Sequence, residues 1–359
     1  MPDEGEGQAA PDDRVLEGET GQDFGDEPSQ DFESEVKQVG KMYDDGVLIF
    51  SREGLQSIAH EVQRCRDESG IHTLAHLAID GNIVEYPAPQ RRDKYGQTKT
   101  NEIWPYVWYR SIEEMTELGF IFGDAKMARL SAHISSVYWE TDEDEPPGLA
   151  PSSPAQDLRR RFDETRSGWE ASEHYSQVKK LIASAIKPVT HRLKLVGFAC
   201  GVIDQYESSA MQHRALAQHV MLTGIRSFLS SLSAPDGPST PEVQCYVQDP
   251  SNTDLSKQVL HASGLTVLDD PMGFLEVDEH SVVVSIAPDV PIKQIVADLG
   301  RPAAMIWNEI HEDDARSTDP ASSRVKEMLA RDYVGVDFPH HEDAANKLVL
   351  WVRKDLALL

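Results

Sequence analysis

From residue 193 onward, short apolar runs alternate with amphipathic stretches. The runs that read as buried strands cover residues 195–199, 243–247, 265–268, 281–287, 303–307 and 347–352. Apolar positions recur at helical spacing between them, as in the stretch that contains Met211, Val220, Met221 and Ile225. Strands that alternate with helices favour a largely parallel sheet with helices on both faces. Residues 151–359 are therefore predicted to form a Rossmann-like α/β domain.

The first 150 residues carry weaker patterns. Residues 1–45 are rich in Asp, Glu, Gly and Gln and poor in aromatic residues, which predicts a disordered acidic tail. Residues 46–50 predict a short strand, and Ser51 is expected to cap the helix that follows. We expect residues 46–150 to form a mixed α+β region that ends in an acidic, proline-rich linker.

The first strand–helix connection of the α/β domain is the expected ligand site, because ligands of such sheets bind beyond the carboxyl ends of the strands. It reads Cys200-Gly201, then Asp204-Gln205-Tyr206-Glu207. The dinucleotide-binding fingerprint G-x-G-x-x-G is missing its third glycine. Gly201 is expected to serve the turn, and Cys200 reads more readily as a buried thiol than as a nucleophile.

Asp204 and Glu207 admit two interpretations. Asp followed three residues later by Glu is typical of a capping box at a helix N-terminus, and the residue types alone favour this interpretation. Alternatively, the two carboxylates grip a guanidinium or ammonium group through charge-assisted hydrogen bonds, or one of them takes a proton from an attacking amine.

Other polar residues follow predicted strand ends or the same turn. They are the substrate-binding candidates Gly201, Ser208, Asp249, Asp289 and Asn308. Ser208, like Ser209, could accept an acyl group, although helix capping explains a serine there equally well. His213 and His219 are six residues apart and do not share a helix face, so we predict no metal site and no cofactor.

Charge narrows the range of partners. The formal net charge of -27 argues against a general nucleic-acid binder, and we expect no DNA partner, because phosphate contacts need clustered Lys and Arg. Residues 1–45 hold 15 acidic and 3 basic residues, whereas residues 151–200 hold 9 basic and 5 acidic residues. This basic segment reads first as a solvated helical face and, in the alternative, as a footprint for a polyanion.

The lengths of the apolar runs and the spacing of the cysteines indicate the cellular compartment. The chain lacks an apolar run long enough to span a membrane, and its acidic N-terminus does not resemble a secretory signal. Its three cysteines have neither metal nor disulfide spacing. We therefore expect a cytoplasmic protein that does not contact membranes.

The second half resembles a known family. The segments that show the resemblance are LVGFACG, Gln212-His213, YVQDP at 246–250, GLTVL at 264–268 and SVVVSIAPDVPIKQIVADLGRPAAMIWN at 281–308. In this order they resemble the Sensitivity to Red Light Reduced-like domain family over roughly residues 175–310, and the resemblance implies a Rossmann-like domain.

Two functions are associated with that family. Some members are linked to light, clock or haem-related signalling without catalysis. A fungal branch, the arginine-containing cyclodipeptide synthases, condenses arginine from arginyl-tRNA with a second aminoacyl-tRNA-derived amino acid into a diketopiperazine. The D-x-x-E motif tied to that branch is similar to Asp204 through Glu207, so the resemblance implies a synthase with these two catalytic residues and the two charged tRNAs as partners. A nucleotide-dependent transferase is a third possibility.

Overall fold

A computed structural model describes residues 30–68, 70–88, 105–117, 125–135, 155–187, 193–205, 209–232, 243–311, 317–339 and 347–358. The C-terminal half is built on a seven-stranded sheet with the order β10-β11-β9-β8-β5-β6-β7. Its strands are β5 (Lys194–Phe198), β6 (Gln244–Gln248), β7 (Thr266–Leu268), β8 (Ser281–Ser285), β9 (Ala304–Asn308), β10 (Tyr333–Asp337) and β11 (Leu348–Arg353).

The strands β9, β8, β5, β6 and β7 run parallel, whereas β11 runs antiparallel to both β9 and β10. The predicted Rossmann-like α/β fold is therefore confirmed. Strand β10 was not predicted, because it begins at the residue after helix α10 (Ser323–Asp332) with no turn between them.

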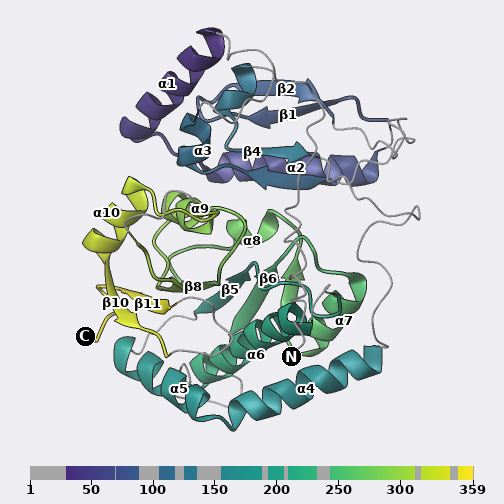
Figure 1. Cartoon of the computed structure of the whole chain (residues 1–359), viewed down its shortest axis with the longest axis vertical. Coiled ribbons are helices and arrows are strands. Elements are labelled where there is room, and N and C mark those ends of the chain that lie inside the picture. Colours follow the sequence, from purple (N-terminus) through teal and green to yellow (C-terminus); the bar gives the residue numbers. More distant parts are fainter. Residues whose placement is uncertain are drawn as a thin grey trace, which may run out of the picture.

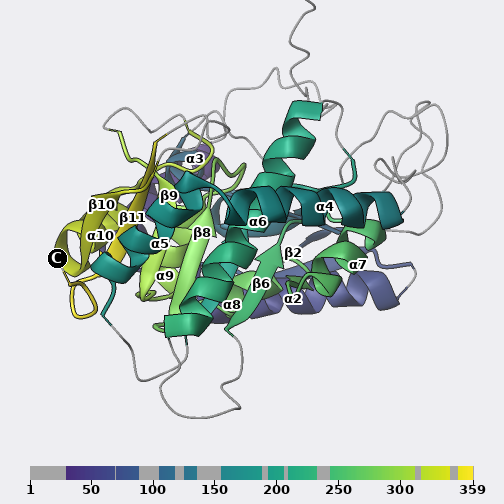
Figure 2. The same ribbon diagram turned by 90° about the horizontal axis from the view of Figure 1, so that it is seen from below.

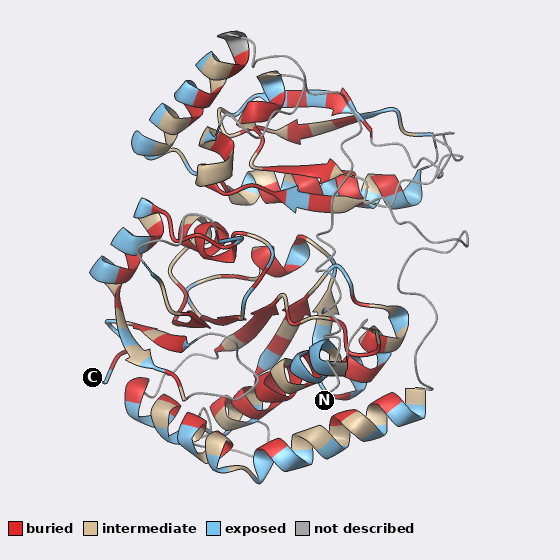
Figure 3. Ribbon diagram, in the orientation of Figure 1, coloured by how far each residue is buried: buried red, intermediate tan, exposed pale blue. Residues whose placement is uncertain are grey.

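Helices cover both faces of the sheet (Figures 1 and 2). One face carries α4 (Ala155–Glu170), α5 (Glu173–Ala185), α6 (Ser209–Leu232) and α7 (Asp254–Ala262), and the other carries α8 (Met272–Leu275), α9 (Ile292–Leu299) and α10. Alternate residues of one strand enter the two cores: Val283 packs on the α9 side, and Val282 and Val284 pack on the α6 side. The central strands β8 and β9 are accordingly buried along their whole length, whereas the edge strands β7 and β10 are partly exposed (Figure 3).

The N-terminal region is a mixed α+β layer over α8, α9 and α10 (Figure 1). It comprises α1 (Gln30–Asp44), α2 (Arg52–Asp67), β1 (Thr73–Leu77), β2 (Ile83–Pro87), β3 (Tyr106–Tyr109), α3 (Ile112–Thr116), the 3-10 helix η1 (Ala125–Arg129) and β4 (Ala132–Ser135). Strands β1 and β2 form one antiparallel pair, and β3 and β4 form another. Its apolar residues share one core with α9 and α10.

Two N-terminal predictions are wrong. Residues 30–44, assigned to the disordered tail, form α1, because Phe32, Val36 and Val39 give this acidic stretch one apolar face. Residues 46–50, predicted as a strand, are irregular. The backbone N–H groups of Ile49 and Phe50 donate to the carboxylate of Asp298 (2.8 and 3.1 Å) instead of a neighbouring strand. Residues 1–29 lie outside the described residues.

Ser51 is confirmed as the N-cap of α2, where its hydroxyl accepts from the Gly54 N–H at 3.0 Å. The predicted helical stretch after the linker is two helices, because Ser172 caps α5 after a turn at Ala171. The linker itself lies outside the described residues.

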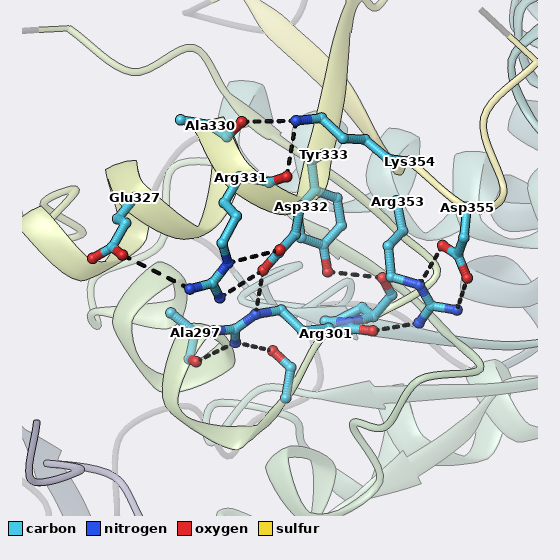
Figure 4. Close-up of polar contacts among 12 residues, drawn as sticks. Ala297, Arg301, Glu327, Ala330, Arg331, Asp332, Tyr333, Arg353, Lys354 and Asp355 are labelled. Carbon is cyan, nitrogen blue, oxygen red and sulfur yellow. Dashed lines mark hydrogen bonds and ion pairs between the residues drawn. The ribbon is translucent and has the colours of Figure 1, made fainter.

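A charged network holds the last helix and hairpin in place (Figure 4). Arg301 donates to Asp332 at 2.9 Å and to the carbonyl of Ala297 at 2.8 Å, so it joins the end of α9 to the end of α10. Arg353 on β11 donates to the carbonyl of Arg301 at 2.7 Å. The network is built from main-chain and carboxylate acceptors, which gives it a structural role.

The N-terminal layer should be sensitive to acid. Burial lowers the pKa of His76 to about 4 and that of His133 to about 3, well below the usual value of an unfolded chain. The unfolded state then binds more protons below about pH 6.5, so stability falls as the pH drops toward those values. We expect each histidine to cost about 2 kcal/mol of unfolding free energy between pH 7 and pH 5.

Urea unfolding at both pH values tests this expectation. His76→Phe should lose less stability on acidification than the wild type, whereas a change at the exposed His60 should leave the loss unaltered. An equal loss in wild type and His76→Phe would contradict the prediction.

Candidate functional site

The strand order reverses at β5, since β6 and β7 lie on one side of it and β8 and β9 on the other. Ligands of open α/β sheets bind beyond the carboxyl ends of the strands at such a switch point. Ala199 (φ 52°) and Ala287 (φ 49°) follow the ends of β5 and β8, and they are the only non-glycine residues with positive φ among those described. Such strain costs on the order of 1–3 kcal/mol and clusters at functional sites.

The turn after β5 contacts the end of β6. Gly201 has φ 76°, and its N–H donates to the Asp249 carboxylate at 2.7 Å. The second oxygen of Asp249 accepts from the Ser251 N–H at 3.0 Å. The structure thus joins two of the residues predicted to bind substrate, and backbone donors fix the orientation of the carboxylate.

Three carboxyl groups at this edge, Asp249, Asp270 and Asp289, form what we call the acidic edge. Asp270 accepts from the Tyr109 hydroxyl at 2.5 Å and from the Gln248 amide at 2.9 Å. Burial raises the pKa of Asp270 to about 7; the bond from Tyr109 opposes this shift, and the charge of Asp249 adds to it.

The other two members of the acidic edge are also held above their ordinary pKa. Burial raises the pKa of Asp249 against the bonds from Ser251 and Gly201. Desolvation of the carboxyl group raises the pKa of Asp289, although the residue as a whole is exposed, and the charge of Asp249 raises it further. Because their charges repel one another, a bound cation would stabilise the edge.

Tyr106, half-buried on β3, links the N-terminal layer to the acidic edge. Burial raises the pKa of its phenol, and the charges of Asp270, Asp289 and Asp249 raise it further. The charges of all three carboxylates therefore act on the phenol of Tyr106. Neither Asp270 nor Tyr106 was predicted as a site residue. Asp270 could have been predicted, because it lies two residues beyond a predicted strand. Tyr106 could not, because only tertiary packing brings it to the edge.

Two asparagines at the edge have unpaired side-chain atoms. The Asn308 amide oxygen accepts from the Ala287 N–H at 2.6 Å, while its Nδ2 has no partner among the described residues. In the loop after β6, both Oδ1 and Nδ2 of Asn252 lack a hydrogen-bond partner among the described residues, although Asn252 is only 9% exposed. Buried amides normally have partners, so both positions suit a ligand or an ordered water.

The fully buried carboxylate of Asp204 accepts from Thr253 at 2.6 Å and from Ser256 at 2.5 Å, the N-cap and an early residue of α7. Residues 206–208, where a cap of the helix after Asp204 would form, lie outside the described residues, so the capping interpretation stays a prediction. Asp204 fixes the start of α7 and the loop that carries Asn252.

Glu207 and Ser208 lie outside the described residues, so their assignments stay predictions. Cys200 is buried, and burial holds the pKa of its thiol well above the usual value, which argues against a nucleophile. His219 is buried within α6 and its Nδ1 contacts the Ala215 carbonyl. Among the described side chains, no group of three or more metal-ligand types is arranged to hold an ion.

Four cations of the basic segment form ion pairs with nearby carboxylates. Arg159 and Arg166 pair with Asp163, and Arg160 pairs with Glu164. Lys194 pairs with Glu276 and Asp278. These pairs favour the solvated helical face over a footprint for a polyanion.

Comparison with known proteins relates the segment that carries this edge to a known domain family. Residues 178–348 match the SRR1 domain. The match runs from α5 to the first residue of β11, so the matched segment contains the switch point and all three carboxylates of the acidic edge. The predicted family resemblance is supported at the level of this domain, and the match does not distinguish the branches of the family. No curated protein matches the chain.

Solved structures similar to the chain include three methyltransferases. One from Geobacter sulfurreducens is 12% identical, with 57% of this chain and 91% of that chain covered and a TM-score of 0.29. The magnesium protoporphyrin IX methyltransferase of Synechocystis PCC 6803 is 10% identical, with 59% and 87% covered and a TM-score of 0.28. The N-methyltransferase NodS of Bradyrhizobium japonicum WM9 is 10% identical, with 57% and 98% covered and a TM-score of 0.25. No described helix is long and apolar enough to cross a membrane.

Proposed function

We propose that the protein is an arginine-containing cyclodipeptide synthase, which condenses arginine from arginyl-tRNA with an amino acid from a second aminoacyl-tRNA. The observation that carries the proposal is the acidic edge: the pKa of Asp249, Asp270 and Asp289 is raised by burial, and the charge of Asp249 raises the pKa of the other two further. A guanidinium is a planar cation that carboxylates bind through paired hydrogen bonds, and it relieves their mutual repulsion.

The chemistry needs no further activation, because an aminoacyl ester is already reactive. The α-amine of one aminoacyl group attacks the ester carbonyl of the other; an amide bond forms, the ester C–O bond breaks, and the tRNA hydroxyl leaves with a proton. The second amine then attacks the remaining ester, closes the ring and releases the second tRNA. The protein must supply proximity, a base for the attacking amine and a site for the arginine side chain.

We assign these roles to separate residues. The acidic edge binds the guanidinium, and Asn308 Nδ2 and the Gly201 turn contact the substrate backbone. Glu207 takes the proton from the attacking amine, and Asp204 positions the loops from within the protein, consistent with its full burial. Ser208 stays a candidate for a transient acyl acceptor.

Incubation of the full-length protein with arginyl-tRNA, a mixed aminoacyl-tRNA pool and mass spectrometry tests the proposal. We expect an arginine-containing cyclic dipeptide that disappears when arginyl-tRNA is omitted, and at least 100-fold less product from Glu207→Gln, as expected for loss of a general base. A folded wild-type protein that makes no cyclic dipeptide would refute the proposal.

One observation favours the non-catalytic alternative, a regulatory protein with the same domain. Both hydrogen bonds given above for Asp204 are to α7, which is a structural use of the first residue of the D-x-x-E motif. A folded wild-type protein that makes no cyclic dipeptide, together with a loss of stability in Asp204→Ala, would favour this alternative.

A further inference from the structure

The carboxylate of Asp270 is held by donors from two different parts of the protein. The Tyr109 hydroxyl, from the N-terminal layer, donates to Oδ1 at 2.5 Å, and the Gln248 amide, from the sheet, donates to the same oxygen at 2.9 Å. Asp270 is half-buried, and its Oδ2 has no hydrogen-bond partner among the described residues. One oxygen is therefore fixed by two donors, and the other is left for a cation at the acidic edge.

The ring of Tyr109 is held in place by aromatic side chains. Tyr109 is 5% exposed, and its ring centroid lies 6.4 Å from that of Phe50 and 5.4 Å from that of Phe274. Phe274 stacks in turn on Phe198, the last residue of β5, at 4.6 Å. A continuous aromatic contact thus joins the N-terminal layer to the strand at the switch point and keeps the Tyr109 hydroxyl in one position.

The second donor is fixed as well. Gln248 is the last residue of β6, and its Oε1 accepts from the Gly273 N–H at 2.6 Å, which turns Nε2 toward Asp270. A Cβ at position 273 would lie 2.7 Å from that oxygen, so this approach requires glycine. Both donors to Asp270 are therefore preorganised before any ligand binds.

We propose that Tyr109 is a positioning residue of the acidic edge: its hydroxyl holds the Asp270 carboxylate in the orientation that receives a cation, which makes the N-terminal layer part of the binding site. Tyr109 lies outside residues 178–348, so the segment that matches the SRR1 domain does not contain this contact. The inference rests on the guanidinium binding proposed above, and it adds a residue that acts through Asp270. A cationic side chain can approach from solvent, because Asp289 is exposed.

The bond from Tyr109 also favours the ionised form of Asp270. Burial raises the pKa of Asp270 to about 7, and the bond from Tyr109 and the charge of Arg66 oppose this rise, whereas the charges of Asp249 and Asp269 add to it. Loss of the Tyr109 hydroxyl should therefore raise the pKa of Asp270 further. A cation that needs the carboxylate would then bind fully only at a higher pH.

Other charged and titratable groups surround Asp270. Those that act on it or on its direct neighbours are Tyr106 of β3, Asp249 after β6, Asp269 beside it, Asp289 after β8, Arg66 of α2 and Lys257 of α7. Among the described residues, the Tyr109 hydroxyl forms its hydrogen bond with Asp270 and with none of these groups. Removal of that hydroxyl therefore acts first on Asp270.

Titration of the full-length protein with N-acetylargininamide from pH 6 to pH 9 tests the positioning role. The guanidinium is the only titratable group of this probe and stays charged over the whole range. We expect wild-type binding to tighten as the pH rises through about 7, and the midpoint to lie about one pH unit higher in Tyr109→Phe. The variant should then bind about fivefold more weakly at pH 7 and about equally well at pH 9.

Tyr86→Phe is the matched control. Tyr86 is a buried tyrosine of the same layer, and its hydroxyl accepts from the Ile134 N–H at 2.8 Å. This variant should keep the wild-type midpoint, whatever its stability. Tyr109→Phe retains the aromatic ring, so circular dichroism should show a folded protein. An unchanged midpoint in Tyr109→Phe, or a loss of affinity that is equal at every pH, would overturn the inference.

A measurement without ligand separates this inference from the proposed function. Carbon-13 NMR of the aspartate carboxyl groups, with the Asp270 resonance identified by its absence in Asp270→Asn, should show a higher pKa of Asp270 in Tyr109→Phe than in wild type. Equal binding of N-acetylargininamide and N-acetylcitrullinamide, with a shifted Asp270 titration, refutes the guanidinium site alone. Selective binding of N-acetylargininamide with an unshifted titration refutes the role of Tyr109 alone.

Discussion

Lys293→Met should lower the free energy of unfolding by about 3–5 kcal/mol, the cost of leaving one member of a buried ion pair alone. The side chains of Lys293 and Asp319 are 4% and 3% exposed, and Nζ lies 2.9 Å from the Asp319 carboxylate. The Lys293 N–H also donates to Asp319 at 2.9 Å, so the pair fixes the start of α9 directly after the Asp289 loop. Urea unfolding monitored by circular dichroism measures the loss.

Two control variants are measured in the same way. Replacing both partners, with Lys293→Met and Asp319→Leu together, should recover part of the loss, because no unpaired charge is left buried. Lys326→Met on the exposed face of α10 should change stability by less than about 0.5 kcal/mol. A loss for Lys293→Met no larger than that of Lys326→Met would show that the pair does not stabilise the fold.

Asp204→Ala should cost about 3 kcal/mol of unfolding free energy, because it leaves the hydroxyls of Thr253 and Ser256 without their acceptor in a site that excludes water. Asp204→Asn keeps one acceptor oxygen and should cost about half as much. Chemical denaturation of the two variants measures the difference, with Asp254→Ala, an exposed first-turn residue of the same helix, as the control.

This prediction separates the two roles considered for Asp204. If Asp204 positions α7, any loss of product is accompanied by a loss of stability, and Asp204→Asn retains part of the stability and part of the product formation. Full wild-type stability of Asp204→Ala together with complete loss of product would contradict the positioning role and support direct catalysis.

The sheet was predictable because its strands are continuous apolar runs between polar turns. Strand β8, read as residues 281–287, is the clearest case, and its buried segment is Ser281–Ser285. Strand β10 was not predicted because four of its five residues are half-buried or exposed at an antiparallel edge and a helix precedes it without a break. Helix α1 was not predicted, because the acidic composition of residues 1–45 indicated disorder and the three apolar positions of the buried helix face were not taken as a helical pattern.

The edge positions of the site followed from one rule, that polar residues after parallel strands meet at the same edge. The rule placed Gly201, Asp249, Asp289 and Asn308 there. It could not show that Asp204 turns toward Thr253, 49 residues away, or that Tyr106 comes from a separate layer to the same carboxylates. Those relations depend on tertiary packing, which no local pattern encodes.

The central claim is that the acidic edge recognises a guanidinium, and two esters that differ only in that charge test it most directly. Titration of the full-length protein with arginine methyl ester and citrulline methyl ester should give at least about tenfold tighter binding of the arginine ester. Asp289→Asn should remove most of this preference, and Glu327→Gln, an exposed acid on α10, should leave it intact. Equal binding of the two esters to the wild-type protein would contradict the account.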